Sequence, residues 1–380
     1  MKVLRRVNAR PEPVLTALRE ALLDDGAPVA PVPPGAAPPP EAHVPEDVVL
    51  AVTTSGSTGR PRTVLLGREA LLASARATEE RLGGPGRWLL CLPVHHVAGL
   101  QVLARSLLAG TEPFLMDPGA SFTAEALAAA VEAMDGPRRY ASLVPTQLYR
   151  ALASPAGAAA LARLDAVLVG GAATEPALLA RAQEAGVRVV RTYGMTETAG
   201  GCVYDGVPLA GVEVAVVDGL VEIAGPVLAH GYLGEPDLTA ERFRERQGRR
   251  WLRTSDLAEL RDGVLIVLGR ADDVVTTGGV KVAPAAVEAV LAELPGVARA
   301  CVVGVPDAEW GQAVTAVLVP AEGATVPPLE RVRDHVARSL GGPAAPRHLL
   351  VLPELPARGP GKTDRRAVQQ IAAEAVSRRR

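Results

Sequence analysis

The feature that most constrains the fold is a strand–helix–strand unit near the middle of the chain. Residues 166–169 (Ala-Val-Leu-Val) form an apolar run typical of a buried strand, residues 175–184 favour a helix, and residues 188–191 favour the next strand. Such a unit indicates a parallel sheet, because the helix returns the chain to the starting end of the sheet. Strands and helices alternate in this way from about residue 48 to 270. We therefore expect an α/β fold built of αβ-layered sheets.

The pattern changes twice further along the chain. After Gly201 the apolar segments become short and β-like (212–217, 220–223, 257–260 and 264–267), which favours a β-rich, antiparallel subdomain. From Arg270 the pattern begins anew, with a helix from Pro284, strands over 300–305 and 313–319, and a helix over 329–340. We predict a large N-terminal domain over 1–269 and a small, mobile α+β C-terminal domain over 270–380.

The N-terminal region combines a helical pattern with a proline-rich stretch. Residues 13–23 favour a helix, and residues 28–40 contain seven prolines. Proline lacks the backbone N–H that a helix or a central strand requires, so we expect residues 28–40 to be an extended surface connector. A proline-rich ligand for a partner protein is the alternative.

Composition excludes several classes of protein. The 380 residues are 48% hydrophobic and carry a net charge of −2, which argues against a dedicated nucleic-acid binder. No segment has the apolar length of a membrane span or a signal peptide. Cys91, Cys202 and Cys301 are widely separated and suggest neither a disulfide framework nor a zinc site. We expect a cytoplasmic protein without an integral membrane segment.

Lysine is rare in this chain. Only positions 2, 281 and 362 are lysine, so 37 of the 40 Lys and Arg residues are arginine. A lysine that persists against such a bias is a candidate for a role that needs a compact ammonium group. Lys362 follows the sequence Pro-Ala-Arg-Gly-Pro-Gly and is therefore a candidate functional residue, although a mobile basic tail is the alternative.

A Ser/Thr/Gly loop follows the predicted strand over 48–52. Its residues, Thr53-Thr54-Ser55-Gly56-Ser57-Thr58-Gly59, offer hydroxyls and unhindered backbone N–H groups that suit a phosphate. It lacks the Lys-Ser/Thr pair of a Walker loop, since Arg60-Pro61 follow Gly59. A flexible linker is the alternative.

A second candidate site follows the strand at 188–191. In Tyr193-Gly194-Met195-Thr196-Glu197-Thr198, Tyr193 offers a face for a base, Thr196 a hydroxyl for a phosphate oxygen, and Glu197 an oxygen ligand for Mg²⁺. A turn that begins a helix would contain the same residue types.

Three further segments contain candidate residues. His95-His96 lie in an apolar setting without acidic partners, which favours a pocket-lining or structural role over a metal site. Asp256 could accept both hydroxyls of a ribose, or it could form a turn. Gly278-Gly279 follow the predicted domain boundary, where glycine permits a hinge or the close approach of a ligand.

Taken together, these segments resemble the adenylate-forming superfamily of acyl-CoA synthetases, peptide-synthetase adenylation domains and luciferases, from about residue 48 to 370. The resemblance implies ATP, Mg²⁺ and coenzyme A as ligands. It implies the following roles: phosphate contacts from Thr54, Ser55, Gly56, Ser57, Thr58 and Gly59; adenine contacts from Gly171, Ala172, Ala173, Tyr193 and Gly194; α-phosphate and Mg²⁺ contacts from Thr196 and Glu197; ribose contacts from Asp256 and Arg270; a hinge at Asp272; a CoA-side loop with Gly278, Gly279 and Lys281; and Lys362 as the adenylation lysine.

Two positions depart from that family pattern. Arg62 stands where lysine is usual, and Ser255 stands where glycine is usual. The region before the phosphate loop is shorter than in most of the family.

Compact members include the o-succinylbenzoate–CoA ligases of menaquinone biosynthesis. Residues 142–148 and 278–282 look like theirs. This resemblance implies an acyl pocket that includes His96, Val144, Thr146 and Gln147.

The resemblance implies a ligase that makes an acyl-AMP and then an acyl-CoA thioester. The expected partners are a small carboxylic acid, ATP and CoA, and a homodimer is an open alternative. Three functional alternatives also remain: a general acyl- or aryl-CoA synthetase, an adenylation enzyme that loads a carrier protein, and a nucleotide-binding regulator without catalysis.

Overall fold

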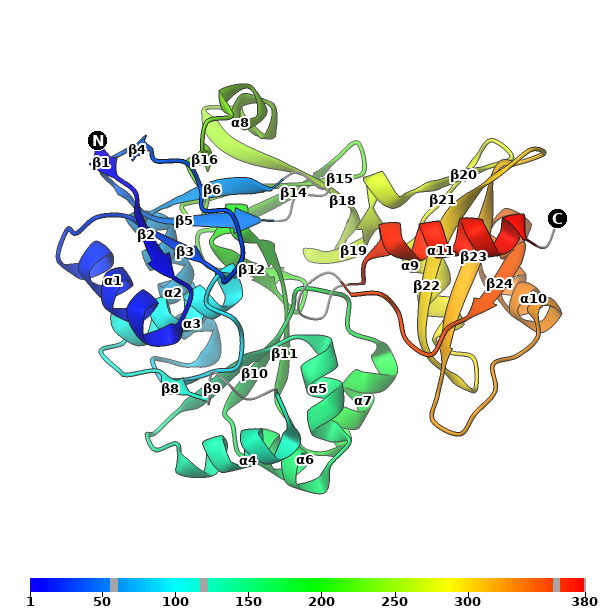
Figure 1. Cartoon of the computed structure of the whole chain (residues 1–380), viewed down its shortest axis with the longest axis horizontal. Helices are drawn as coiled ribbons and strands as arrows, with labels where there is room; N and C mark the ends of the chain where they lie inside the picture. The colour runs from blue at the N-terminus through cyan, green and yellow to red at the C-terminus, as the bar shows by residue number, and fades with distance from the viewer. Residues whose placement is uncertain (55–60, 117–121, 358–362, 379–380) are drawn as a thin grey trace. The chain divides into compact units, whose positions relative to one another are not determined.

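The computed structural model describes residues 1–54, 61–116, 122–357 and 363–378 (Figure 1). Their contacts divide the chain into two compact units. Unit 1 contains residues 1–215, 222–254 and 262–265, and unit 2 contains residues 216–221, 255–261 and 266–380. None of the helices among the described residues has the length and apolarity to cross a bilayer. The boundary that we placed between 269 and 270 stays a prediction.

The central element of unit 1 is a seven-stranded sheet with the order β13-β12-β11-β10-β9-β7-β8. Its strands are β7 (Arg87–Leu90), β8 (Phe114–Leu115), β9 (Arg139–Leu143), β10 (Ala166–Val169), β11 (Val189–Met195), β12 (Gly200–Tyr204) and β13 (Val207–Pro208). The strands from β8 to β11 pair in parallel, whereas β12 pairs antiparallel with β11. All four residues of β10 are buried, as a parallel strand covered on both faces requires.

Helices pack on this sheet. Leucines from four of them join Val167 and Val169 of β10 in one apolar core, and these helices are α4 (Ala124–Ala133), α5 (Pro145–Leu152), α6 (Pro155–Ala162) and α7 (Pro176–Glu184). Two more helices, α2 (Arg68–Leu82) and α3 (Val97–Leu108), contact β12. The helix predicted over 175–184 and the strand predicted over 166–169 are therefore confirmed.

A second sheet of unit 1 has the order β16-β6-β5-β3-β2. It contains β2 (Arg5–Asn8), β3 (Val29–Val32), β5 (Val48–Thr54), β6 (Arg62–Gly67) and β16 (Gly231–Tyr232), and it is contacted by α1 (Pro11–Leu23). A short pair, β1 (Lys2–Val3) and β4 (His43–Val44), lies beside it. The hairpin of β5 and β6 places the Ser/Thr/Gly loop between two paired strands.

The interpretation of residues 28–40 as a connector is wrong for its first part. Val29–Val32 form β3, which lies between β2 and β5 despite Pro31. The carbonyls of Pro28 and Val32 accept hydrogen bonds from Arg5 and Ala9, so alternate residues face β2. Pro31 faces the other side, where the pairing with β5 is limited to Val29. A strand tolerates proline at such a position because no ladder hydrogen bond is lost.

A third sheet has the order β14-β15-β18-β17, with β19 paired to β18. It is formed by β14 (Glu213–Val217), β15 (Leu220–Ala224), β17 (Phe243–Arg246), β18 (Arg249–Arg261) and β19 (Val264–Arg270), and α8 (Pro236–Arg242) precedes β17. The predicted β-rich region is confirmed, although the segment predicted over 257–260 is the end of a much longer strand.

The remainder of unit 2 is an α+β fold. Its sheet has the order β21-β20-β23-β22, with β24 beside β23. The elements are η2 (Ala271–Asp273), β20 (Val275–Thr277), β21 (Val280–Val282), α9 (Pro284–Leu291), β22 (Val297–Asp307), β23 (Gly311–Pro320), α10 (Leu329–Leu340), η3 (Gly342–Ala344), β24 (His348–Val351) and α11 (Arg365–Ser377). One apolar core includes residues of α9 and α10, and a second includes residues of α11. The helix predicted over 329–340 is confirmed residue for residue.

Candidate active site

The candidate site of unit 1 is at the carboxyl edge of the parallel strands. His96 follows β7, Val144 follows β9, Gly171 follows β10 and Thr196 follows β11. Because these neighbouring strands are parallel, the segments that follow them emerge at one edge of the sheet. A Cβ atom at Gly171 would lie 3.7 Å from Cγ1 of Val144, which places the segments after β9 and β10 side by side. Gly171, Ala172 and Ala173 are exposed, as residues that contact a ligand must be.

The turn that contains Thr196 and Glu197 is tightly closed. These residues form a 3₁₀ turn, η1 (Thr196–Thr198), between β11 and β12. The Thr198 hydroxyl accepts a hydrogen bond from the Met195 amide at 3.0 Å and donates to the Gly200 carbonyl at 2.8 Å. The sequence offered two interpretations of this segment, and the structure shows a turn that leads into a strand instead of a helix.

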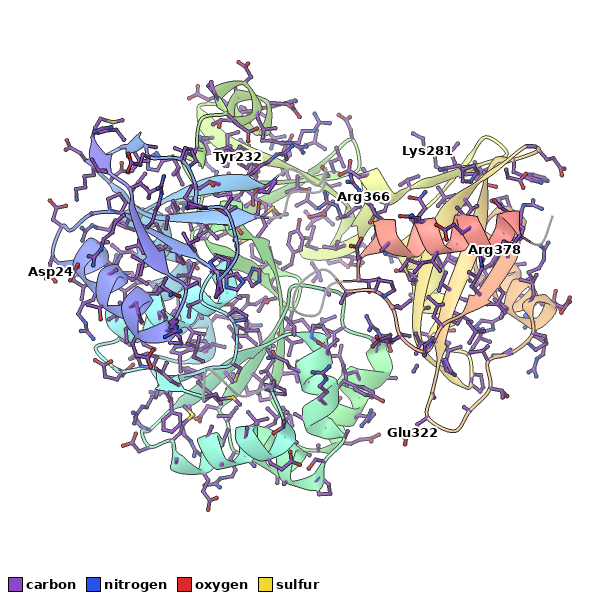
Figure 2. The ribbon with its side chains drawn as sticks, viewed as in Figure 1. Asp24, Tyr232, Lys281, Glu322, Arg366 and Arg378 are labelled. Atoms are coloured by element: carbon purple, nitrogen blue, oxygen red, sulfur yellow. The ribbon has the colours of Figure 1, made fainter. Side chains whose placement is uncertain are left out.

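Glu197 is supported from the second sheet. The Tyr232 hydroxyl, on β16, donates a hydrogen bond of 2.9 Å to Oε1 of Glu197 (Figure 2 labels Tyr232). The Glu197 carbonyl accepts from the Ala229 amide at 2.8 Å. Burial and the adjacent Glu197 carboxylate raise the pKa of the Tyr232 phenol, so the hydroxyl stays a donor at neutral pH. Tyr232 therefore fixes one carboxylate oxygen and leaves Oε2 for another partner.

This geometry fits a magnesium ion brought by a nucleotide. Magnesium usually binds one or two carboxylates together with substrate phosphates. The described residues contain no cluster of three or more His, Cys, Asp or Glu that could hold a metal by themselves. Glu197, with one oxygen held by Tyr232, is suited to complete the coordination of a phosphate-bound ion.

The hairpin of β5 and β6 bounds the predicted phosphate loop. Thr53 and Thr63 share a hydrogen bond of 3.0 Å between their hydroxyls, and the Thr54 hydroxyl donates to the Arg62 carbonyl at 3.4 Å. Ser55, Gly56, Ser57, Thr58 and Gly59 lie outside the described residues, so their predicted phosphate contacts stay predictions. β6 also pairs with β16, which carries Tyr232. The two ends of this loop and the support of Glu197 therefore belong to one sheet.

His95 and His96 lie at the start of α3. Their ring centroids are 4.2 Å apart, and His96 is the N-terminal cap residue of the helix. Burial lowers the pKa of His95, which keeps its imidazole neutral. A Cβ atom at Gly99 would lie 2.4 Å from the Pro93 carbonyl oxygen, so only glycine lets the helix begin this close to the preceding segment. The structural or pocket-lining interpretation of these two histidines stays a prediction.

One of the predicted acyl-pocket residues, Gln147, holds the backbone through its side chain. The Gln147 amide accepts from the Val144 N–H at 3.1 Å and donates to the Cys91 carbonyl at 2.8 Å. Gln147 is buried, and its amide joins the segments that follow β7 and β9. Thr146 is partly exposed. Within this group, Thr146 is the better candidate for a polar contact with a substrate.

The predicted ribose and hinge residues meet in unit 2. Arg270 donates to Asp256 at 3.4 Å with one nitrogen and to Asp272 at 2.9 Å with the other. The Asp256 side chain is largely buried, whereas Asp272 is exposed. One guanidinium therefore joins the predicted ribose contact to the predicted hinge residue. Sequence spacing alone did not indicate this pairing.

Lys362 lies outside the described residues, but both flanks of its segment are fixed. Ala357 and Thr363 form an antiparallel bridge, and the Asp364 amide donates to the Pro356 carbonyl at 2.8 Å. Arg365 then binds both oxygens of Glu288, at 2.6 and 3.1 Å, and lies 3.2 Å from a carboxylate oxygen of Asp273. These contacts connect the start of α11 to α9 and η2.

Comparison with known proteins identifies the family. Residues 4–233 match the AMP-binding enzyme family, and residues 286–362 match the AMP-binding enzyme C-terminal domain. The chain belongs to the AMP-binding enzymes. The family and the fold inferred from its motifs are therefore confirmed.

Several relatives of this AMP-binding enzyme have described activities or structures. A probable 2-succinylbenzoate–CoA ligase of Mycobacterium tuberculosis is 48% identical over 340 residues, covering 88% of this chain and 87% of the relative. The 2-succinylbenzoate–CoA ligase of Salmonella typhimurium is 35% identical over 344 residues, covering 88% and 71%. The o-succinylbenzoate CoA synthetase of Bacillus subtilis, solved with an acyl-adenylate intermediate, has a TM-score of 0.72 at 28% identity and covers 85% and 69%.

The predicted CoA-side segment of this AMP-binding enzyme lies against Trp310. A Cβ atom at Gly278 would lie 2.7 Å from the Trp310 ring, and the Gly278 amide donates to the Trp310 carbonyl at 3.0 Å. The Arg347 guanidinium lies 3.6 Å from the centroid of the same ring. Gly279 has open space around it, and Lys281 is exposed on β21 (Figure 2).

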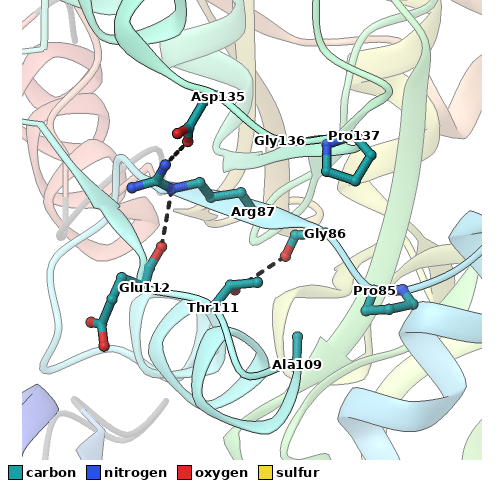
Figure 3. A pocket seen from close by; sticks show the side chains of 9 residues that line it. All are labelled: Pro85, Gly86, Arg87, Ala109, Thr111, Glu112, Asp135, Gly136 and Pro137. Atoms are coloured by element: carbon teal, nitrogen blue, oxygen red, sulfur yellow. Dashed lines mark hydrogen bonds and ion pairs between the residues drawn. The ribbon is translucent and has the colours of Figure 1, made fainter.

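A pocket of about 520 Å³ lies on the opposite edge of the large sheet, at the amino end of β7 (Figure 3). The residues that line it bind one another: Arg87 is paired with Asp135 and donates to the Glu112 backbone carbonyl, and Thr111 donates to the Gly86 backbone carbonyl. None of the predicted site residues that the structure describes lines this pocket, so it is separate from the candidate site.

Sequence reasoning missed Tyr232, the hydrogen-bond donor to Glu197. It lies 35 residues further along the chain. With only five tyrosines in the protein, its rarity was the single available signal. Its contact with Glu197 depends on the pairing of β16 with β6 and could not be read from spacing.

Proposed function

We propose that this AMP-binding enzyme is a 2-succinylbenzoate–CoA ligase. The observation that carries the proposal is the 48% identity over 340 residues with the probable 2-succinylbenzoate–CoA ligase of M. tuberculosis. The supported Glu197 carboxylate and the Asp256–Arg270 pair are consistent with an active catalyst. They weigh against a regulator that has lost catalysis.

The proposed reaction has two steps. A carboxylate of the acid attacks the α-phosphorus of ATP, and pyrophosphate leaves with the electrons of the broken P–O bond. The thiol of CoA then attacks the carbonyl of the acyl-AMP, and AMP leaves. A thiol pKa of about 8.5 leaves a few per cent as thiolate at neutral pH, so no dedicated base is required.

We assign the first step to residues of both units. Thr54, residues 55–59 and Thr196 would bind phosphate oxygens, and the Lys362 ammonium would neutralise charge on the oxygens around the α-phosphorus. Magnesium, when bound at Glu197, supplies further positive charge there. Gly171–Ala173, Tyr193 and Gly194 would contact adenine.

The remaining predicted contacts belong to the nucleotide sugar and to CoA. Asp256 and Arg270 would hold the ribose. After rotation at Asp272, Gly278, Gly279 and Lys281 would border the CoA arm. We propose a cytoplasmic location, consistent with three free cysteines among the described residues. The homodimer alternative is tested by size-exclusion chromatography with light scattering.

A pyrophosphate-release assay across carboxylic acids tests the substrate. We expect 2-succinylbenzoate to give kcat/KM at least about tenfold above 3-benzoylpropionate, which lacks the ring carboxylate, because a site that binds a charged group rejects a substrate without it. Equal rates with fatty or benzoic acids would support a general acyl-CoA synthetase. That alternative has one favourable observation, a 32% identity with a medium/long-chain fatty-acid–CoA ligase of M. tuberculosis.

The acyl acceptor is tested in the same assay. Thioester formation with CoA is expected, whereas pyrophosphate release without a CoA product would favour a carrier protein as acceptor. No pyrophosphate release with any acid would contradict a catalytic role and favour the regulator.

A further inference from the structure

A seam of buried polar side chains joins α2 and α3 to the start of β12. Ser74 and Thr78 lie one turn apart on α2, and Gln101 and Arg105 lie one turn apart on α3. All four residues are at most 3% exposed. Burying polar groups is costly unless they are hydrogen-bonded, so such a seam requires a reason.

Two residues of the seam, Thr78 and Arg105, bind Tyr204. The Thr78 hydroxyl shares a hydrogen bond of 3.0 Å with the Tyr204 hydroxyl, and Arg105 donates to the same oxygen at 3.4 Å. The Arg105 guanidinium also lies over the Trp88 ring, 4.9 Å from its centroid. These bonds join the C-terminal halves of α2 and α3 to the last residue of β12.

The other two residues of the seam, Gln101 and Ser74, bind Ala199. Ala199 follows Thr196, Glu197 and Thr198 in the chain. Its carbonyl accepts hydrogen bonds from the Gln101 side-chain amide and from the Ser74 hydroxyl, the latter at 3.3 Å. Ala199 has φ 51°, a left-handed conformation that costs energy for any residue with a Cβ. Two side-chain donors on one carbonyl hold the backbone in this conformation.

The strained conformation of Ala199 shapes the turn before it. The Ala199 amide donates to the Thr196 carbonyl at 3.0 Å and closes the 3₁₀ turn. A Cβ atom at Gly200 would lie 3.3 Å from Cγ of Gln101, so Gln101 packs directly against this connection. Anything that releases Ala199 therefore alters where Thr196 and Glu197 lie.

We propose that Gln101, assisted by Ser74, is a positioning residue for the nucleotide–magnesium site. It holds Thr196 and Glu197 through the Ala199 carbonyl, while Tyr232 holds the Glu197 carboxylate from the opposite sheet. Gln101 is on the helix that begins beside His96, so the same helix links the predicted acyl pocket to the turn. The inference rests on the proposed function, because it assumes that Thr196 and Glu197 bind the nucleotide and its magnesium.

The test compares Gln101→Met with the wild-type enzyme. Methionine keeps the length of the side chain but cannot donate a hydrogen bond. We expect the Mg²⁺ concentration for half-maximal pyrophosphate release to rise at least about fivefold, and the stabilisation of the protein by Mg²⁺–ATP in thermal unfolding to shrink. The rate of thioester formation from pre-made acyl-AMP and CoA should stay within about twofold.

Ser106→Ala is the matched control. Ser106 is on the same helix, is fully buried, and its hydroxyl has no hydrogen-bond partner among the described residues. It should leave the Mg²⁺ dependence unchanged. If Gln101→Met fails to fold, Ser74→Ala removes the weaker donor and should shift the Mg²⁺ dependence in the same direction by a smaller factor.

Two outcomes would overturn the inference. One is an unchanged Mg²⁺ requirement in Gln101→Met. If Gln101→Met fails to fold, an unchanged Mg²⁺ requirement in Ser74→Ala has the same meaning. The other is a Ser106→Ala shift as large as that of Gln101→Met. Failure of the proposed function is recognised separately, because the wild-type enzyme would then release no pyrophosphate. The Mg²⁺–ATP thermal shift would still compare the variants in that case.

Discussion

At the scale of single residues, several predicted site residues also form hydrogen bonds or ion pairs that hold neighbouring parts of the protein in place. Glu197 contributes its carbonyl to Ala229 and one carboxylate oxygen to Tyr232. Gln147 joins two segments at the carboxyl edge of the sheet. Arg270 binds both Asp256 and Asp272. The side-chain contacts fix rotamers that a free side chain would lose entropy to adopt on binding a ligand.

Lys362→Ala should separate the two half-reactions. Loss of the ammonium removes positive charge from the adenylation step alone, so we expect acyl-AMP formation to fall at least about 100-fold. Thioester formation from pre-made acyl-AMP should be nearly unchanged. Stopped-flow pyrophosphate and thioester assays measure both steps. Lys2→Ala is the control, since Lys2 is ion-paired with Asp25 in the N-terminal region. An equal loss of both steps in Lys362→Ala would contradict the role of Lys362 in adenylation.

His95 should make stability depend on pH. Burial lowers its pKa in the folded state below the ordinary value of 6.5. The unfolded chain then binds a proton at a higher pH than the folded chain does, so the free energy of unfolding falls as the pH drops through and below about 6.5. In His95→Gln this part of the pH dependence should disappear. Urea unfolding at pH 7.5 and 5.5 measures the free energy of unfolding of both proteins. The same loss of unfolding free energy between these pH values in the wild type and in His95→Gln would exclude the effect.

At the scale of elements, the connection from β11 to β12 controls the site. The strands come so close that a Cβ atom at Gly194 would lie 2.0 Å from the Gly200 carbonyl oxygen. η1 is inserted between these strands, and β16 contacts it through Tyr232 and the preceding Ala229. The position of Thr196 and Glu197 therefore follows from strand packing as much as from the motif itself.

Gly194→Ala should damage both stability and activity. The added methyl group must separate β11 from β12, which we expect to cost about 2–3 kcal/mol of unfolding free energy. Pyrophosphate release should fall with it, because Thr196 and Glu197 move. Gly186→Ala is a useful comparison: Gly186 has φ 73° and open space, so only backbone strain of about 1 kcal/mol is expected. Denaturant unfolding of both variants checks this, and equal effects would refute the crowding argument.

At the scale of the whole molecule, the predicted site residues are divided between the two units. Unit 1 contains the turn with Thr196 and Glu197 and the acyl-pocket candidates, whereas unit 2 contains Asp256, Arg270 and the flanks of the segment with Lys362. Arg365 stabilises unit 2 internally by binding Glu288 and approaching Asp273 beside the predicted hinge. These three residues all follow Asp272, so the proposed rotation at Asp272 would move the part of unit 2 after this residue as one body.

Asp272→Pro should arrest that movement. Proline fixes φ at 272 and restricts Ala271, so a rotation at this position becomes difficult. We expect adenylation to remain within about threefold of wild type and thioester formation to fall at least about tenfold. Asp272→Ala removes the ion pair with Arg270 without fixing the backbone and should retain both steps. If Asp272→Ala also lost thioester formation, the loss would be due to the missing ion pair with Arg270 and not to the fixed backbone at 272.

The sequence by itself determined the α/β class, most elements and the family. Apolar runs such as 166–169 and the helix over 329–340 are read correctly because local periodicity reports burial directly. The Thr196–Glu197 and Asp256–Arg270 motifs are recognisable because their residue types and order suit a nucleotide.

Only the tertiary structure decided how these residues are held. Tyr232 reaches Glu197, Gln101 reaches Ala199, and Pro31 lies within a sheet, because strands and helices far apart in sequence are adjacent in space. The reason is physical: periodicity records which face of an element is buried, whereas a hydrogen bond between elements depends on strand order and register. Those are set by the packing of the whole unit, which no local pattern encodes.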